Sequence, residues 1–159
     1  TGLPGRMEDF SSKDKPLIVV DYAHTPDALE KALSGLKPYC KGKLFCIFGC
    51  GGGRDVGKRS QMGSVAEALS DQIILTNDNP RYESPDQIFE NILEGIKNKS
   101  KVIIKEDRSD ALISAFIEAN SDDVILLAGK GHEMTQQIDS ITVPFSDREL
   151  AKRLTEEHS

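Results

Sequence analysis

A short connection between two expected elements places an acid, an amide and an arginine together, Asp78-Asn79-Pro80-Arg81. A turn needs residues that bend the chain, but it does not need a proline that restricts the backbone next to a guanidinium group. Such a guanidinium can grip both oxygens of a carboxylate. Arg81 could instead pair with Asp78 or Glu83 across the turn, since exposed ion pairs are common and weak. The stretch nevertheless indicates a ligand site.

A glycine-rich loop offers a second arginine. Residues 52–59, Gly-Gly-Arg-Asp-Val-Gly-Lys-Arg, have the glycine and lysine spacing of a phosphate-binding P-loop, but Arg59 stands where a Ser or Thr binds magnesium. The missing hydroxyl argues against a true ATP-binding P-loop. A backbone that lies close to a small polar ligand, while Arg54 meets a carboxylate, accounts for the glycines and for Arg54 and Asp55.

A third polar stretch is Gly129-Lys130-Gly131-His132-Glu133. It is not a zinc-binding helix, because no second histidine follows four residues after the first. Its glycines allow close backbone approach, and Glu133 could hold an ammonium group. A pocket with carboxylates for an ammonium group and guanidinium groups for a carboxylate suits a zwitterion such as a free amino acid; its predicted lining is Arg54, Asp78, Asn79, Arg81 and Glu133.

Five apolar runs recur along the chain with amphipathic helical stretches between them: residues 17–20, 44–48, 72–76, 102–104 and 124–128. The runs do not alternate with polar residues, as expected of parallel strands that are covered on both faces. Helix starts are indicated at Thr25-Pro26, Ser84-Pro85 and Ser146. The predicted fold is α/β, a Rossmann-like, doubly wound and mostly parallel sheet of about six strands with helices on both faces. Residues 137–143 could add an antiparallel hairpin or edge, and the last helix is expected to end near Leu154.

Ligands of such sheets bind beyond the carboxyl ends of the strands. The polar and glycine-rich segments of this chain follow the predicted strands, at residues 21–24, 49–58, 78–81, 107–108 and 129–133. We therefore expect the site at that edge of the sheet. His24 could equally be a structural residue at a helix start, and Asp107 and Arg108 are interpreted as helix-start residues with a local ion pair and no function.

Composition narrows the classes of protein. A chain of 159 residues fits one domain, and its net charge of −6 disfavours binding to nucleic acid or to an anionic membrane surface. No apolar run approaches the roughly 20 residues of a membrane helix. The three cysteines, Cys40, Cys46 and Cys50, fit buried thiols in a reducing, cytoplasmic compartment better than disulfides or a metal site. The first residues look like a linker, which suggests a chain cut from a larger protein.

Several stretches, taken in order, resemble the C-terminal domain of the Mur ligases, of the diaminopimelate-adding (MurE) type. The resemblance spans nearly the whole chain. Singly its motifs are modest, but jointly and in this order they are very specific. They are Leu3-Pro4-Gly5-Arg6-Met7-Glu8, Asp21-Tyr22-Ala23-His24-Thr25-Pro26, Gly49-Cys50-Gly51-Gly52 with Arg54-Asp55 and Gly57-Lys58-Arg59, Asp78-Asn79-Pro80-Arg81, and Gly129-Lys130-Gly131-His132-Glu133.

The resemblance implies a monomeric enzyme of peptidoglycan synthesis. It would use ATP and Mg²⁺ to convert the D-Glu carboxylate of UDP-MurNAc-L-Ala-D-Glu into an acyl phosphate, which the amine of meso-diaminopimelate then attacks. Residues 1–15 would be a linker and residues 16–159 the amino-acid-binding domain. The N-terminal UDP-binding domain and the central ATPase domain, which mainly holds ATP and Mg²⁺, would be absent, so this chain alone would not catalyse.

The resemblance also assigns residues. It implies that meso-diaminopimelate is bound by Arg54, Asp78, Asn79, Pro80, Arg81, Gly129 and Glu133, and that the ATP-facing side carries Arg6, Asp21, Tyr22 and His24. It implies no catalytic residue and no metal ligand within the chain. Two alternatives stay open at this point: a lysine-adding or other Mur-type ligase domain, and a free-standing Rossmann-like module that binds its nucleotide unaided.

Overall fold

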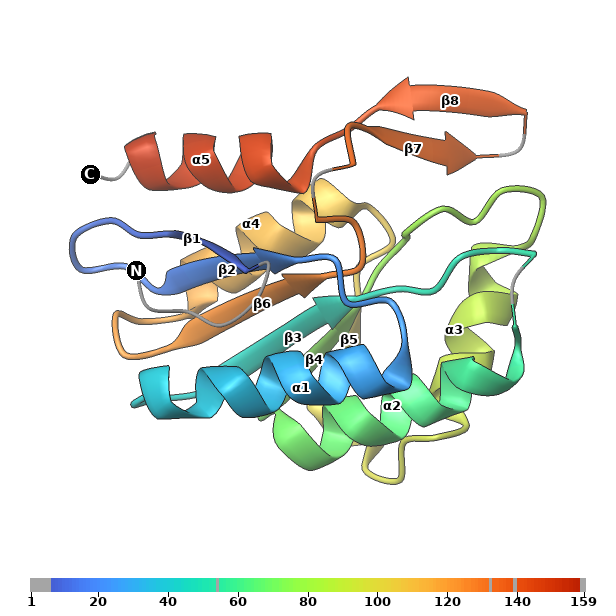
Figure 1. Ribbon diagram of the computed structural model, residues 1–159, viewed down its shortest axis with the longest axis horizontal. Helices are drawn as coiled ribbons and strands as arrows, with labels where there is room; N and C mark the ends of the chain where they lie inside the picture. Colours follow the sequence, from blue (N-terminus) through green and yellow to red (C-terminus); the bar gives the residue numbers. More distant parts are fainter. Residues whose placement is uncertain (1–6, 54, 132, 139, 158–159) are drawn as a thin grey trace.

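A six-stranded sheet forms the centre of the computed structural model, which describes residues 7–53, 55–131, 133–138 and 140–157 (Figure 1). Its strand order is β1-β2-β6-β3-β4-β5, and every neighbouring pair is parallel except β1 with β2. This confirms the predicted fold class. The strands are β1 (Glu8–Phe10), β2 (Leu17–Asp21), β3 (Leu44–Phe48), β4 (Gln72–Leu75), β5 (Val102–Ile104) and β6 (Val124–Ala128).

Helices cover both faces of this sheet (Figure 1). One face packs against α1 (Pro26–Leu36), α2 (Gly57–Leu69) and α3 (Pro85–Leu93), and the other against α4 (Arg108–Glu118) and α5 (Asp147–Glu157). Short 3₁₀ helices, η1 (Lys37–Tyr39) and η2 (Lys99–Lys101), lie in the connections. The result is a three-layer, doubly wound arrangement.

Two hydrophobic cores explain why the strands are apolar throughout. Val19 of β2 belongs to the core beneath α1, α2 and α3, whereas its neighbours Ile18 and Val20 belong to the core beneath α4 and α5. Successive side chains of a strand point to opposite faces, so a strand covered on both sides has no position for a polar residue. The predicted apolar stripe of α1 is fully buried; it consists of Leu29, Ala32, Leu33 and Leu36.

The predicted helix starts are confirmed in position. The hydroxyl of Thr25 accepts a hydrogen bond from the Ala28 N–H at 3.2 Å, and that of Ser146 accepts one from the Glu149 N–H at 3.2 Å. Ser84 occupies the N-cap of α3, although its side chain makes no cap hydrogen bond within the described residues. The last helix continues to Glu157, beyond the expected end near Leu154.

The start of the described chain corrects one expectation. Residues 8–10 were expected to belong to a linker covering residues 1–15, but they form β1 and pair antiparallel with β2. Arg148 of α5 also pairs with Glu8, with 2.6 Å between Nε and Oε1. The strand was missed because three residues, two of them acidic, carry no apolar pattern, and an edge strand needs none. Residues 8–10 therefore belong to the sheet.

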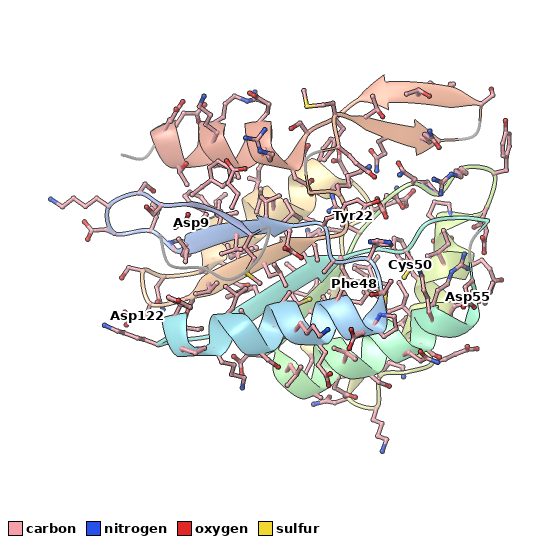
Figure 2. The ribbon with its side chains drawn as sticks, viewed as in Figure 1. Asp9, Tyr22, Phe48, Cys50, Asp55 and Asp122 are labelled. Atoms are coloured by element: carbon pink, nitrogen blue, oxygen red, sulfur yellow. The ribbon has the colours of Figure 1, made fainter. Side chains whose placement is uncertain are left out.

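The C-terminal tail forms an antiparallel hairpin, which is one of the two arrangements that the sequence predicts for it. Strands β7 (Thr135–Ile138) and β8 (Ile141–Pro144) pair antiparallel and make a separate two-stranded sheet. The hairpin lies beyond the carboxyl ends of the parallel strands, where the polar loops gather (Figure 1). Figure 2 shows Tyr22 and Cys50 at this end of the molecule, with Asp122 at the opposite end.

Candidate ligand-binding pocket

A cavity of about 240 Å³ lies at the carboxyl ends of the strands and is called the edge pocket below. It brings together four of the side chains that the sequence predicted for a zwitterion site with two of those expected to face ATP. Arg54 and Arg6, which were also predicted, lie outside the described residues. The lining is Tyr22, His24, Gly49, Cys50, Gly51, Lys58, Asp78, Asn79, Arg81 and Glu133.

Arg81 is held by several hydrogen bonds. Its guanidinium donates to the Gly52 carbonyl from Nη1 at 3.1 Å and to Gln137 Oε1 from Nε at 3.1 Å. Its backbone N–H donates to the Gln137 carbonyl at 3.1 Å, and its φ is +55°. Among the described residues no acidic side chain forms an ion pair with Arg81, and Glu83 pairs with Arg59 instead. The alternative that Arg81 pairs with Asp78 or Glu83 across the turn is therefore wrong.

Asp78 and Asn79 are surrounded by cations and donors. Asp78 is only 9% exposed. Its burial raises the pKa of the carboxyl group, and the positive charges of Arg108 and Lys130 oppose that rise. Asn79 Oδ1 accepts hydrogen bonds from the Gln137 N–H at 2.9 Å and from Lys130 Nζ at 3.1 Å. The amide of Asn79 is therefore anchored through its oxygen.

Pro80 and Gly129 shape the backbone of the site. Pro80 is buried, and a side chain on the neighbouring Gly52 would collide with its carbonyl oxygen. Gly129 has a φ of +114°, a conformation that residues with a side chain rarely adopt, and its N–H donates to the Asp21 carbonyl at 3.0 Å. Gly52 thus lets its loop approach the turn at Pro80, and Gly129 lets the chain turn after β6.

Lys130 contacts residues of the edge pocket without lining it, a position that the sequence did not reveal. Its side chain is completely buried, and its ammonium group lies 2.9 Å from the Thr135 carbonyl, 3.1 Å from Asn79 Oδ1 and 3.3 Å from Glu133 Oε1. Asp78 Oδ1 lies 3.5 Å away. A lysine is almost never buried without partners, and a lysine between two glycines gives no sign of which partners it has. Its burial could therefore not be predicted.

Arg59 is a second basic residue whose role was missed. Its fully buried guanidinium pairs with both oxygens of Glu83, at 2.6 and 2.8 Å, and donates to Asn91 Oδ1 at 2.9 Å. These hydrogen bonds lower the pKa of Glu83 to about 2. Arg59 thus holds the loop that carries Arg81 against α2 and α3, and its guanidinium is engaged at the position where a P-loop would carry a hydroxyl.

Arg108 corrects another expectation. Asp107 caps α4 as predicted, accepting a hydrogen bond from the Ser109 N–H at 2.8 Å. Arg108, however, makes a long-range ion pair rather than a local one: its Nε and Nη2 each lie 2.8 Å from an oxygen of Asp147, and both side chains are fully buried. The pair could not be predicted because its members are 39 residues apart.

The residues expected to face ATP lie beside the same pocket. Asp21 Oδ2 accepts a hydrogen bond from the Ala23 N–H at 2.8 Å, which fixes the turn after β2. The rings of Tyr22 and His24 stack at an angle, with centroids 4.6 Å apart. Tyr22 and Glu133 also line a neighbouring cavity of about 360 Å³, so the two walls are continuous.

Other kinds of site find no support within the described residues. No group of histidine, cysteine or acidic side chains among them could hold a metal ion. Burial raises the pKa of both Cys46 and Cys50 to about 12, in keeping with the predicted buried thiols, whereas Cys40 is only half-buried, contrary to the prediction. None of the described helices has the length and apolar character needed to cross a membrane.

Known proteins match both the sequence and the fold. A family model described as "Mur ligase, glutamate ligase domain" matches residues 5–131. The UDP-N-acetylmuramoyl-L-alanyl-D-glutamate–2,6-diaminopimelate ligase of Coxiella burnetii is 56% identical over 151 residues, which are 95% of this chain and 31% of that protein. The ligase of the same name from Haemophilus influenzae is 55% identical over 94% of the chain and 31% of its own length. The chain thus spans about a third of these curated relatives.

Solved structures agree with this match. A structure of UDP-N-acetylmuramoyl-L-alanyl-D-glutamate–2,6-diaminopimelate ligase superposes with a TM-score of 0.90 and 40% identity, covering 99% of this chain and 32% of that one. A bifunctional folylpolyglutamate synthase/dihydrofolate synthase has a TM-score of 0.61 and 23% identity over 80% of this chain and 29% of that one, a likeness of fold alone.

Proposed function

The chain belongs to the Mur ligase family, and from that premise we propose that it is the C-terminal, amino-acid-binding domain of a ligase that adds meso-diaminopimelate to UDP-MurNAc-L-Ala-D-Glu. In that reaction ATP transfers a phosphoryl group to the D-Glu carboxylate. The amine of the incoming amino acid then attacks the acyl phosphate, and an amide, ADP and phosphate result. The full-length enzyme would act as a monomer in the cytoplasm.

The mixed charge of the edge pocket carries this proposal. Arg81 offers a guanidinium, while Asp78 and Glu133 offer carboxylates around the same cavity. meso-Diaminopimelate carries an ammonium group and a carboxylate at each of its two ends. Its distal ammonium group would lie near Glu133, and its distal carboxylate would receive hydrogen bonds from Arg81. L-Lysine lacks that carboxylate and would leave the guanidinium unpaired.

The other assigned residues complete the pocket. Asn79 would donate from its amide nitrogen, Pro80 would hold the turn before Arg81, and Gly129 would allow the ligand to approach the backbone. Arg54 would meet a carboxylate, an assignment that rests on the resemblance alone because it lies outside the described residues.

ATP would lie on the side of Tyr22 and His24. The attacking amine must reach the acyl phosphate, and the common wall formed by Tyr22 and Glu133 supports neighbouring sites for the two reactants. Asp21 would shape this side, and Arg6 would meet a phosphate from the segment before β1. No group of three or more histidine, cysteine or acidic side chains that could hold a metal ion lies among the described residues. As the resemblance implies, ATP and Mg²⁺ would be held mainly by the central domain of the full-length ligase.

Activity of the isolated chain tests the proposal. The 159-residue chain is expected to release no ADP, because its glycine-rich loop lacks the P-loop hydroxyl and Arg59 is committed to Glu83. The full-length ligase is expected to release ADP only when UDP-MurNAc-L-Ala-D-Glu and meso-diaminopimelate are both present. ADP release by the chain alone, or a full-length protein that ignores meso-diaminopimelate, would overturn the assignment.

A further inference from the structure

We propose that Lys130 is a positioning residue of the edge pocket, whose ammonium group fixes Asn79 and Glu133 relative to one another so that both face the same ligand. The expected effect of Lys130 on catalysis rests on the function proposed above. The effect of Lys130 on Asn79 and Glu133 rests on its own contacts alone.

The ammonium group has no hydrogen bond left for a ligand. It carries three N–H donors, and three acceptors lie within hydrogen-bond distance: the Thr135 carbonyl, Asn79 Oδ1 and Glu133 Oε1. The side chain is also completely buried. Lys130 therefore acts through the neighbours that it holds rather than by touching the ligand.

The orientation of the Asn79 amide follows from this arrangement. Both groups next to its side-chain oxygen, Lys130 Nζ and the Gln137 N–H, are donors. An amide turned the other way would face two donors with its own NH₂ group, which can accept no hydrogen bond. The Asn79 nitrogen is thereby left as a donor for the edge pocket, where it can meet a carboxylate.

Lys130 also separates two like charges. Asp78 Oδ1 and Glu133 Oε1 lie 3.5 and 3.3 Å from the same ammonium group. Asp78 Oδ1 is buried and has no hydrogen-bond partner among the described residues, so the charge of Asp78 is compensated by two nearby cations, Arg108 and Lys130. Without Lys130 the two carboxylates would repel one another more strongly, and Glu133, whose side chain is 37% exposed, is the one free to turn outward.

Two variants of the 159-residue chain test the structural part. Lys130→Met keeps most of the side-chain length but removes the charge and all three donors. Lys41→Met, an exposed lysine before β3 at the other end of the sheet, is the matched control. In ¹⁵N–¹H NMR spectra the Asn79 side-chain amide and the Glu133 backbone amide are expected to shift in Lys130→Met and to stay unchanged in Lys41→Met. Unchanged Asn79 and Glu133 signals in a folded Lys130→Met chain would overturn the proposal.

Kinetics of the full-length ligase test the catalytic part. Lys130→Met is expected to raise the KM for meso-diaminopimelate roughly ten- to a hundredfold, the effect of losing hydrogen bonds to a charged group, while the KM for ATP changes far less. A merely structural defect would raise both or lower only the amount of active enzyme. Equal changes in the two KM values would overturn the proposal.

A measurement on the unaltered chain keeps the proposal testable if Lys130→Met does not fold. An ammonium group whose three protons are all hydrogen-bonded to the protein exchanges them slowly with water. The ¹⁵Nζ signal of Lys130 is therefore expected to be visible, unlike that of the exposed Lys41. A Lys130 ammonium signal that exchanges as fast as that of Lys41 would overturn the proposal. Wild-type ligase that ignores meso-diaminopimelate would refute the proposed function instead, and the NMR results would then decide the role of Lys130 alone.

Discussion

The backbone of Arg81 is set before any ligand arrives. Its φ of +55° is unusual for a residue with a side chain and costs roughly 1–2 kcal/mol. Hydrogen bonds from its N–H and Nε to Gln137 of β7 offset that cost. Strained residues of this kind persist where the surrounding structure over-determines them, and they cluster at ligand sites. The hairpin β7–β8 therefore helps to aim the guanidinium.

Glu83→Gln is expected to lower the free energy of unfolding at neutral pH. It should also make that free energy vary less with pH in acid solution. Arg59 lowers the pKa of Glu83 from 4.5 to about 2, so the ionised carboxylate stabilises the folded state at pH values above 4.5. That contribution is lost as the pH falls from 4.5 to about 2. Urea unfolding of both proteins across this range measures it.

The difference between wild type and Glu83→Gln should thus be largest near neutral pH and shrink in acid. Glu94→Gln, which changes an exposed glutamate just after α3, serves as the control and should show no such trend. A difference for Glu83→Gln that stays constant from neutral to acid pH would contradict the role given to the Arg59–Glu83 pair.

The sequence predicted the acceptors of the pocket better than the cations that support them. Asp78, Asn79 and Glu133 could be placed because loops that follow parallel strands converge at one edge of the sheet. Arg59 and Lys130 could not, since their burial depends on Glu83, 24 residues away, and on Asn79, 51 residues away. No spacing rule links such partners.

At the scale of elements, the Arg108–Asp147 pair joins the starts of two helices to the sheet. Arg108 opens α4 and Asp147 opens α5, and the same guanidinium donates to the Ala128 carbonyl at the end of β6 at 2.8 Å and to the Asn77 carbonyl after β4 at 3.2 Å. Four segments therefore meet at one buried cation behind the edge pocket.

Arg108→Met is expected to destabilise the chain by about 3–5 kcal/mol, because it leaves the buried Asp147 carboxylate without a cation. The double variant Arg108→Met/Asp147→Leu should recover a large part of this loss, since a buried pair replaced by apolar residues of similar size is often tolerated. Urea unfolding of the wild type, each single variant and the double variant measures the coupling. A double variant no more stable than Arg108→Met would contradict the account.

The elements themselves differed in how well they could be predicted. The five parallel strands and the stripe of α1 follow from local periodicity, which needs no knowledge of partners. Strand β1 was missed because its pairing with β2 is what makes Glu8–Phe10 a strand. The sequence indicates the hairpin only as one of two arrangements, because short polar strands such as β7 carry little apolar pattern.

At the scale of the whole molecule, the chain would select the amino acid in the proposed enzyme, whereas activation by ATP would take place elsewhere in it. The chain spans about a third of the length of its curated relatives. Its edge pocket is lined on one side by Tyr22, which is 42% exposed. In the proposed enzyme the acyl phosphate would arrive from this open side, while Arg81, Asn79 and Glu133 hold the far end of the amino acid. The choice of amino acid would therefore be made in this domain.

The most direct test is the ratio of kcat/KM for meso-diaminopimelate to kcat/KM for L-lysine in the full-length ligase and its Arg81→Ala variant. Arg81→Gly is the matched variant, because glycine accepts the positive φ and therefore removes the side chain without the backbone strain that alanine would keep. Wild type is expected to prefer meso-diaminopimelate by tens to thousands of fold, as roughly 2–5 kcal/mol for a lost charge partner implies. Both variants should lose that preference through a higher KM for meso-diaminopimelate, with little change in the KM for ATP. A wild type that uses lysine equally well, or variants that keep the full preference, would contradict the account.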